Sequence, residues 1–352
     1  MAIAGLCGLA AHVSNAQVTA PKYSNEFLNI GVGGRALGMG NVQSAIVSDA
    51  TAGFWNPAGL TKLEKKYNLV GMHSELFAGI VKNDYGSFAT PLDTMSALGV
   101  SLIRVGVDDI ADTRRLFNAG GQIQYDSIDF FSVADYALIV SYARKSNLLP
   151  GLSLGANTKI IYRHVGDFAT CWGFGFDAGA QLERKGWKLG LVAKDITTTF
   201  NAWAINSEEL RDVYSATNNE LPENSVEITL PRLVFGVGRN FAIGKKFSAL
   251  VATDLDFTFD GKRNTLIRSG LVSVDPHVGA EIGYDGIVFL RGGLNNIQEF
   301  KDLEGGESWK VQPNFGVGVA MRGLTLDLAL SKIADNSNVS SVIVSVGYTF
   351  DK

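Results

Sequence analysis

Cysteine is scarce in this chain of 352 residues, which contains only Cys7 and Cys171. If the first sixteen residues are removed on export, Cys171 is the one that remains, and no intramolecular disulfide can form. Basic clusters are also missing, and the net charge of −4 gives no electrostatic reason to expect a nucleic-acid partner. After Ala16 no stretch of about 18 apolar residues occurs, so the sequence predicts no transmembrane helix.

Motifs for catalysis and for cofactor binding are missing as well. The stretch Gly31 to Gly40 lacks Gly-Lys-Ser/Thr, and Ala36 stands where a dinucleotide loop needs its third glycine. His73, His164 and His277 stand singly, without carboxylate or cysteine at metal-ligand spacing. The chain shows no Ser/His/Asp context and no Gly-x-Ser-x-Gly elbow. We therefore expect no catalytic residue, no metal and no cofactor, and we predict that the protein is not an enzyme.

The first sixteen residues, MAIAGLCGLAAHVSNA, have the apolar core of a secretory signal. Ser14 and Ala16 provide the small residues at the two recognition positions, so Gln17 is expected to begin the mature protein. An ordinary buried helix is the alternative interpretation of the same residues. An exported chain that is 46% hydrophobic and lacks an apolar helix is either a soluble secreted protein or an outer-membrane barrel.

Alternation of side chains decides between these two classes. In Gly323 to Ser331 four leucines alternate with Thr, Asp, Ala and Ser, and Thr170 to Glu183 shows the same pattern over a longer run. A period of two is typical of a strand, and the face opposite the apolar one is largely Gly, Ala, Ser and Asp, which suits a crowded lumen. Runs of about ten residues match a membrane-spanning strand. Because lipid cannot satisfy an open edge, the sheet must close.

The predicted fold is all-β: a transmembrane antiparallel β-barrel of about 14 strands in the outer membrane, with both termini periplasmic. We divide the chain into a signal peptide (1–16), a plug (17–66) and the barrel (67–352). Short turns alternate with loops at about 108–132, 164–169, 196–228, 259–275, 295–310 and 333–340. The predicted strands are 67–75, 81–89, 95–107, 133–145, 151–163, 170–183, 186–195, 229–241, 246–258, 276–284, 286–294, 311–321, 323–332 and 341–350.

Residues 27–60 fit neither a strand nor a long helix, because they are rich in glycine. They carry almost no charge, and their single cation is Arg35. Glycine clusters allow positive φ and close backbone approach. Asn56 is a good N-cap, Pro57 fits the first position of a short helical turn, and Gly59 is placed to end it. These features predict a segment packed inside the barrel.

Charges of both signs fall on the predicted lumen faces. We expect them to pair across the barrel and against Arg35, which would fix the plug; a polar permeation path is the alternative. These residues are Lys159, Arg163, Asp177, Glu183, Lys188, Lys194, Asp254, Asp256, Glu281 and Asp327.

Residues 27–60 resemble the PorV/PorQ family of outer-membrane proteins, within the wider FadL-like barrel superfamily. The resemblance implies a fourteen-stranded barrel with an N-terminal plug and a Bacteroidota source. It also implies work with the type IX secretion system: binding of cargo C-terminal signal domains at the SprA/Sov-like translocon and delivery to the surface sortase complex. The motif residues that carry it include Arg35, Gly38, Gly40, Asp49, Trp55, Asn56, Pro57 and Gly59.

Aromatic side chains in two predicted outer loops suggest a contact surface for protein or lipid, with a self-packed lid as the alternative. Our leading hypothesis is an outer-membrane subunit that binds type IX cargo, translocon or attachment components through these loops. The alternative is a FadL-like channel for hydrophobic small molecules, which a lateral gap in the wall would favour. A purely structural subunit is a third hypothesis. The candidate partner-binding residues are Phe117, Tyr125, Phe130, Phe200, Trp203 and Tyr214.

Overall fold

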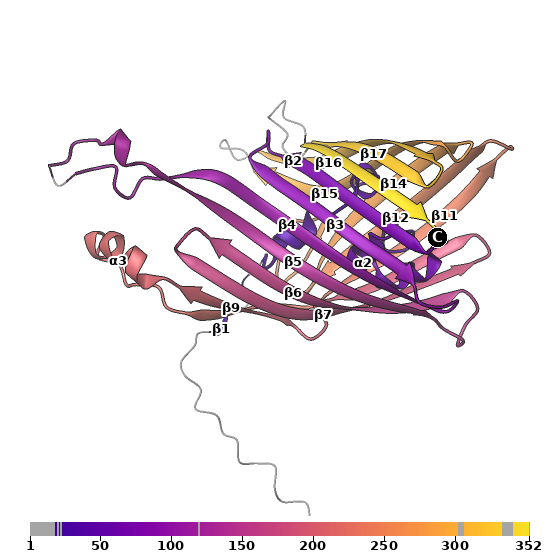
Figure 1. Ribbon diagram of the computed structural model, residues 1–352, viewed down its shortest axis with the longest axis horizontal. Coiled ribbons are helices and arrows are strands. Elements are labelled where there is room, and N and C mark those ends of the chain that lie inside the picture. The colour runs from indigo at the N-terminus through magenta and orange to yellow at the C-terminus, as the bar shows by residue number, and fades with distance from the viewer. Residues whose placement is uncertain are drawn as a thin grey trace, which may run out of the picture.

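Fourteen antiparallel strands close into a barrel, in which each strand bonds to the next and β18 pairs with β2 (Figure 1). The computed structural model describes residues 18–19, 21, 23–118, 120–301, 306–332 and 341–351. The predicted all-β barrel is therefore confirmed. Its strands are β2 (Tyr67–Leu76), β3 (Val81–Pro91), β4 (Ser96–Asp112), β5 (Asp129–Lys145), β6 (Leu152–Val165), β7 (Ala169–Arg184), β8 (Trp187–Lys194), β11 (Arg232–Ile243), β12 (Phe247–Thr258), β14 (Ser273–Tyr284), β15 (Val288–Lys301), β16 (Glu307–Met321), β17 (Leu324–Ser331) and β18 (Ser341–Phe350).

The two faces of the wall differ as the alternation predicts. On β18, Val342, Val344 and Val346 point outward and are exposed, whereas Ile343 and Ser345 point into the lumen and are buried. On β7 the outward residues include Trp172 and Phe174. An apolar outer face of this kind suits lipid, and a lumen face of small residues leaves room for a plug.

The predicted limits of three loops are wrong because strands extend into them. The segment 196–228 contains β9 (Thr199–Ile205), α3 (Ser207–Ala216) and β10 (Ser225–Thr229), and β9 pairs with the first half of β7. The hairpins β4–β5 and β15–β16 likewise run past the predicted limits of loops 108–132 and 295–310. Figure 1 shows the β4–β5 hairpin and α3 projecting beyond the same end of the barrel. The signal peptide and loop 333–340 lie outside the described residues.

A plug occupies the lumen, as predicted. It consists of η1 (Glu26–Asn29), α1 (Gly34–Gly38), α2 (Ala52–Trp55) and η2 (Pro57–Lys62), drawn in indigo inside the barrel in Figure 1. Helix α1 contacts β15 to β18, and η2 contacts β3 to β7. Buried apolar plug residues such as Leu37 and Phe54 pack against Ile103, Ile161 and Ile343 of the wall. No helix in the described part of the chain is long and apolar enough to cross a membrane.

The predicted cap of η2 is confirmed, but its predicted end is wrong. Asn56 Oδ1 accepts a hydrogen bond from the Ala58 amide at 3.2 Å, and Pro57 opens the helix. Gly59 does not end it, since η2 continues to Lys62. A Cβ at Gly59 would lie 2.6 Å from the Val47 carbonyl oxygen. The glycine is needed because two plug segments touch there.

The two described ends of the chain lie at opposite ends of the barrel. Phe350 pairs with Tyr67 at the short-turn end, whereas β1 (Val18–Thr19) pairs in parallel with Val226 and Glu227 of β10 at the long-loop end. Which of these ends faces the periplasm stays a prediction. A periplasmic position of both termini does not fit these pairings, because residues 18–19 and Phe350 lie at opposite ends of the barrel.

Candidate functional site

Among the described residues, strand pairing in the wall has a gap at the long-loop end. Strands β11 and β12 pair as far as Arg232 and Thr258. The strand that precedes β11 in the chain is β10, and the pairings of the described residues do not join β10 to β12. On that side the described partner of β10 is β1. Pro231 separates β10 from β11 because proline has no N–H to donate to a ladder. An uncovered strand edge is unfavourable in lipid, so this gap needs a cover.

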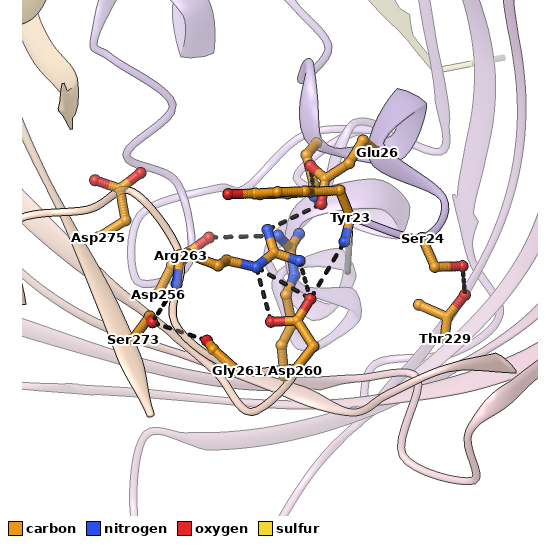
Figure 2. A network of polar contacts seen from close by, with 12 residues as sticks. Tyr23, Ser24, Glu26, Thr229, Asp256, Asp260, Gly261, Arg263, Ser273 and Asp275 are labelled. Carbon is orange, nitrogen blue, oxygen red and sulfur yellow. Dashed lines mark hydrogen bonds and ion pairs between the residues drawn. The ribbon is translucent and has the colours of Figure 1, made fainter. Parts of the chain in front are cut away.

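The cover is the N-terminal strap, which we define as the described residues between Val18 and Asn29. Ser24 Oγ lies 2.7 Å from Thr229 Oγ1 (Figure 2). It also donates a hydrogen bond to the Glu227 carboxylate. Asn25 Nδ2 donates to Thr229 Oγ1 at 2.7 Å. Polar side chains of the strap therefore hold the edge of β10.

Arg263 ties the other side of the strap to the loop after β12. Its Nη1 lies 2.9 Å from Glu26 Oε1, and its Nε donates to Asp260 Oδ1 at 2.9 Å (Figure 2). The guanidinium also lies over the Tyr23 ring, 4.6 Å from the centroid. Burial acts to raise the pKa of Asp260, but hydrogen bonds and the charge of Arg263 outweigh it and hold that pKa below its usual value. Asp260 is therefore an anion that keeps Arg263 in place.

Two adjoining cavities lie behind the strap, with volumes of about 360 Å³ and about 40 Å³. The larger lies between the plug and the wall from β11 to β17, and the smaller reaches Leu230 and Pro231 at the gap. Both are lined by Leu28, Lys194 and Arg263. The smaller cavity thus adjoins both the larger cavity in the lumen and the gap in the wall.

Below the cavities, Arg35 locks the plug to the wall. Its Nε and Nη2 each lie 3.0 Å from a Glu281 carboxylate oxygen. Arg291 donates to Glu281 Oε2 at 2.6 Å and to Asp327 Oδ1 at 2.6 Å. The predicted pairing of Arg35 with inward charges is confirmed, and its partners are Glu281 and, through Arg291, Asp327.

Replacing Arg35 with leucine should loosen the plug. We expect a loss of about 1–3 kcal/mol in unfolding free energy, because Glu281 keeps Arg291 and is not left as an orphaned buried charge, which costs roughly 3–5 kcal/mol. The measurement is the temperature at which the purified barrel changes from the mobility of the folded form to that of the unfolded form in SDS electrophoresis. Arg35→Lys keeps the charge but cannot make both hydrogen bonds to Glu281. Its transition temperature should therefore lie between those of the parent and of Arg35→Leu. An unchanged transition in Arg35→Leu would contradict the lock.

The other motif residues close the plug on itself and on the wall. Asn56 Nδ2 donates to the carbonyls of Ser44 and Ala180, at 2.7 and 3.0 Å. Trp55 Nε1 donates to the Val32 carbonyl at 3.0 Å. Asp49 Oδ1 accepts a hydrogen bond from the Thr51 amide. The backbone of Gly38 lies close to Gly316, and that of Gly40, which has a φ of 66°, lies close to Leu294.

The candidate partner-binding residues divide into two groups. Phe117, Tyr125 and Phe130 are exposed on the hairpin beyond the barrel, at 62%, 73% and 66%. The other three do not share a loop surface: Phe200 faces outward on β9, Tyr214 is half-buried on α3, and Trp203 faces the lumen, where its Nε1 donates to Glu227 Oε2 at 3.0 Å. The alternation of β9 separates Phe200 from Trp203, so the prediction that they form one outer surface is wrong.

The sequence did not identify the strap residues Ser24 and Glu26, or Arg263, which is the partner of Glu26. A signal existed for β9: in TFNAWAI, Phe200, Ala202 and Ala204 alternate with Thr199, Asn201 and Trp203. Arg263 gave no signal, since it is one of three cations in the predicted loop 259–275 and lies in no repeating pattern. Within the described residues, no group of three or more His, Cys, Asp or Glu is placed to hold a metal ion.

Comparison with solved structures identifies the fold. The Pseudomonas putida toluene transporter TodX superposes with a TM-score of 0.58 at 12% identity, over 91% of this chain and 98% of that one. This chain has the fold of the FadL-like barrels. The Ralstonia pickettii toluene transporter TbuX gives 0.56 at 12% identity, and a Pseudomonas aeruginosa FadL homologue gives 0.53 at 12%, each over 91% of this chain and 98% of the other. No protein-family model matches the sequence, and no curated protein matches it.

Proposed function

We propose that this FadL-like barrel is an outer-membrane channel that moves small hydrophobic or amphipathic molecules sideways through the gap beside β10. The observation that carries the proposal is the wall gap, which is covered by the strap and reached by a cavity. A plug held to the wall by Arg35 and Glu281 favours this side route over one straight through the lumen. TodX and TbuX, which share the fold, are toluene transporters, and this supports a small-molecule cargo.

The test is uptake by a strain that lacks the gene. We expect uptake of at least one probe among radiolabelled toluene, octanoate and hexyl glucoside to fall at least fivefold, and to return on complementation. Secretion of proteins to the medium should not change, because the route described above is sized for small molecules. Unchanged uptake of all three probes together with impaired secretion would contradict the channel.

A second candidate function is the type IX docking role that the plug motif implies. One observation favours it: the exposed aromatics Phe117, Tyr125 and Phe130 project beyond the barrel, and Arg114 fixes their hairpin beside α3 by a hydrogen bond to the Glu209 carbonyl at 2.5 Å. In this role the partners would be the translocon, cargo with C-terminal signal domains and the sortase complex. Affinity purification from detergent-solubilised membranes tests it, and recovery of neither translocon nor cargo would count against it.

A further inference from the structure

The larger cavity presents an amide-rich wall that the shared fold does not explain. Five hydrogen bonds of 2.5 to 3.2 Å join six side chains of β15, β16 and β17 into one chain. All six line the larger cavity. In order along the chain they are Gln298, Asn296, Gln312, Ser331, Asn314 and Asn295.

A hydrocarbon would be a poor occupant of this wall. Each amide has two N–H donors and a carbonyl acceptor, so a chain of five bonds among six residues retains further donors and acceptors. Against a hydrocarbon these groups would lose their hydrogen bonds to water without replacement. Hydroxyl groups both donate and accept, and a ligand that carries several of them can bond to the retained groups.

Most of the charged groups around the cavity already have partners, which argues against an ionic ligand. Asp254 accepts from the backbone amides of Gln43 and Ser44, both at 2.9 Å. The Lys194 ammonium lies over the Phe54 ring, 4.8 Å from its centroid. The remaining pairs are Arg232 with Asp256 at 3.6 Å, His277 with Asp275 at 3.6 Å and Arg263 with Glu26 at 2.9 Å.

The path from the cavity to the gap is lined by both apolar and charged side chains, and charged ones pair with one another, as Lys159 does with Asp177 at 2.7 Å. The smaller cavity is lined in part by apolar residues, which are Leu28, Phe54, Ile139, Leu230, Pro231 and Phe259. Phe259, at the edge of the gap, is also exposed on the outside. An amide wall that adjoins this partly apolar passage fits a molecule with two unlike ends.

We propose that the ligand is an amphiphile with an uncharged polyhydroxyl head group, of the class of a short alkyl glycoside. Its head hydrogen-bonds to the amide chain of β15 to β17 in the larger cavity. Its alkyl tail points past Leu28 toward Leu230 and the gap. This inference rests on the proposed channel function and specifies its cargo.

Equilibrium dialysis of the purified protein tests the ligand class, in a detergent without a sugar head group. Radiolabelled hexyl glucoside, octanoate and toluene are the probes. We expect saturable binding of hexyl glucoside, weakened at least tenfold by Gln312→Leu and by Gln298→Leu. Val311→Leu, on the outward face of the same strand β16, should bind as the parent does. Heat-dependent electrophoretic shift confirms that each variant is folded.

Three results would overturn the inference. One is saturable binding of toluene without binding of hexyl glucoside, and another is glucoside binding that neither glutamine variant changes. The third is octanoate binding that Lys194→Met abolishes, which would assign an anionic head to the ligand. In each case the uptake of the probe that binds is compared between the parent and the deletion strain. Lower uptake in the deletion strain supports the channel function even though the proposed ligand class is wrong. If no probe binds and no uptake changes, both proposals fall.

Discussion

A disulfide between Ser24→Cys and Thr229→Cys is expected to abolish uptake through the barrel. The two hydroxyl oxygens lie 2.7 Å apart, so sulfur atoms at these positions would lie near bonding distance. The bridge would fix the strap to β10 over the gap. We expect probe uptake to fall to the level of the deletion strain under oxidising conditions and to return with a reductant. Cys171, buried in β7, should not interfere.

The matched control is a lock of the same geometry at the short-turn end of the lumen. Thr61 Oγ1 and Ser153 Oγ also lie 2.7 Å apart, and they join the plug helix η2 to β6. Thr61→Cys with Ser153→Cys should leave uptake intact, because the plug does not move on the proposed route. If this second lock stops uptake as well, the plug itself must leave the lumen. If neither lock affects uptake, the gap is not the path.

The barrel could be predicted from sequence because its signal is local. Every strand that faces lipid on one side and the plug on the other repeats with period two, as in the leucines from Leu324 to Leu330. The plug could be predicted because it breaks that period and carries helix-capping residues. The ten inward charges, Glu281 among them, are predicted to pair across the barrel and against Arg35 on charge and direction alone, and the structure joins Arg35 to Glu281 across 246 residues.

The gap and its strap could not be predicted in the same way. Asp195 and Thr198 interrupt the wall between β8 and β9 with positive φ values of 55° and 63°, a conformation that non-glycine residues rarely adopt and that their types do not indicate. The contact between Glu26 and Arg263 spans 237 residues, and neither residue lies in a repeating pattern. The candidate site depends on such distant contacts, so residue spacing carries no trace of it.

The largest structural effect is expected from Gly293→Val in β15. A Cβ at this lumen-facing position would lie 2.2 Å from the Met39 carbonyl carbon and 2.3 Å from the Gly40 nitrogen. Overpacking costs about 1–3 kcal/mol where side chains can adjust, but here the obstacle is plug backbone. We expect the plug to be displaced, so that the single-channel conductance in a planar bilayer rises from near zero to that of an open barrel. Cells should also become sensitive to antibiotics that the outer membrane normally excludes.

Gly292→Val is the control, because the neighbouring residue points outward and a Cβ there meets nothing within 4 Å. Valine suits a strand better than glycine does, so this variant should be as stable as the parent or up to about 1 kcal/mol more stable. Both substitutions add the same side chain to the same strand, and only one of them points at the plug. Equal conductance in the two variants would show that the plug does not seal the lumen, and the argument for a sideways route would fail with it.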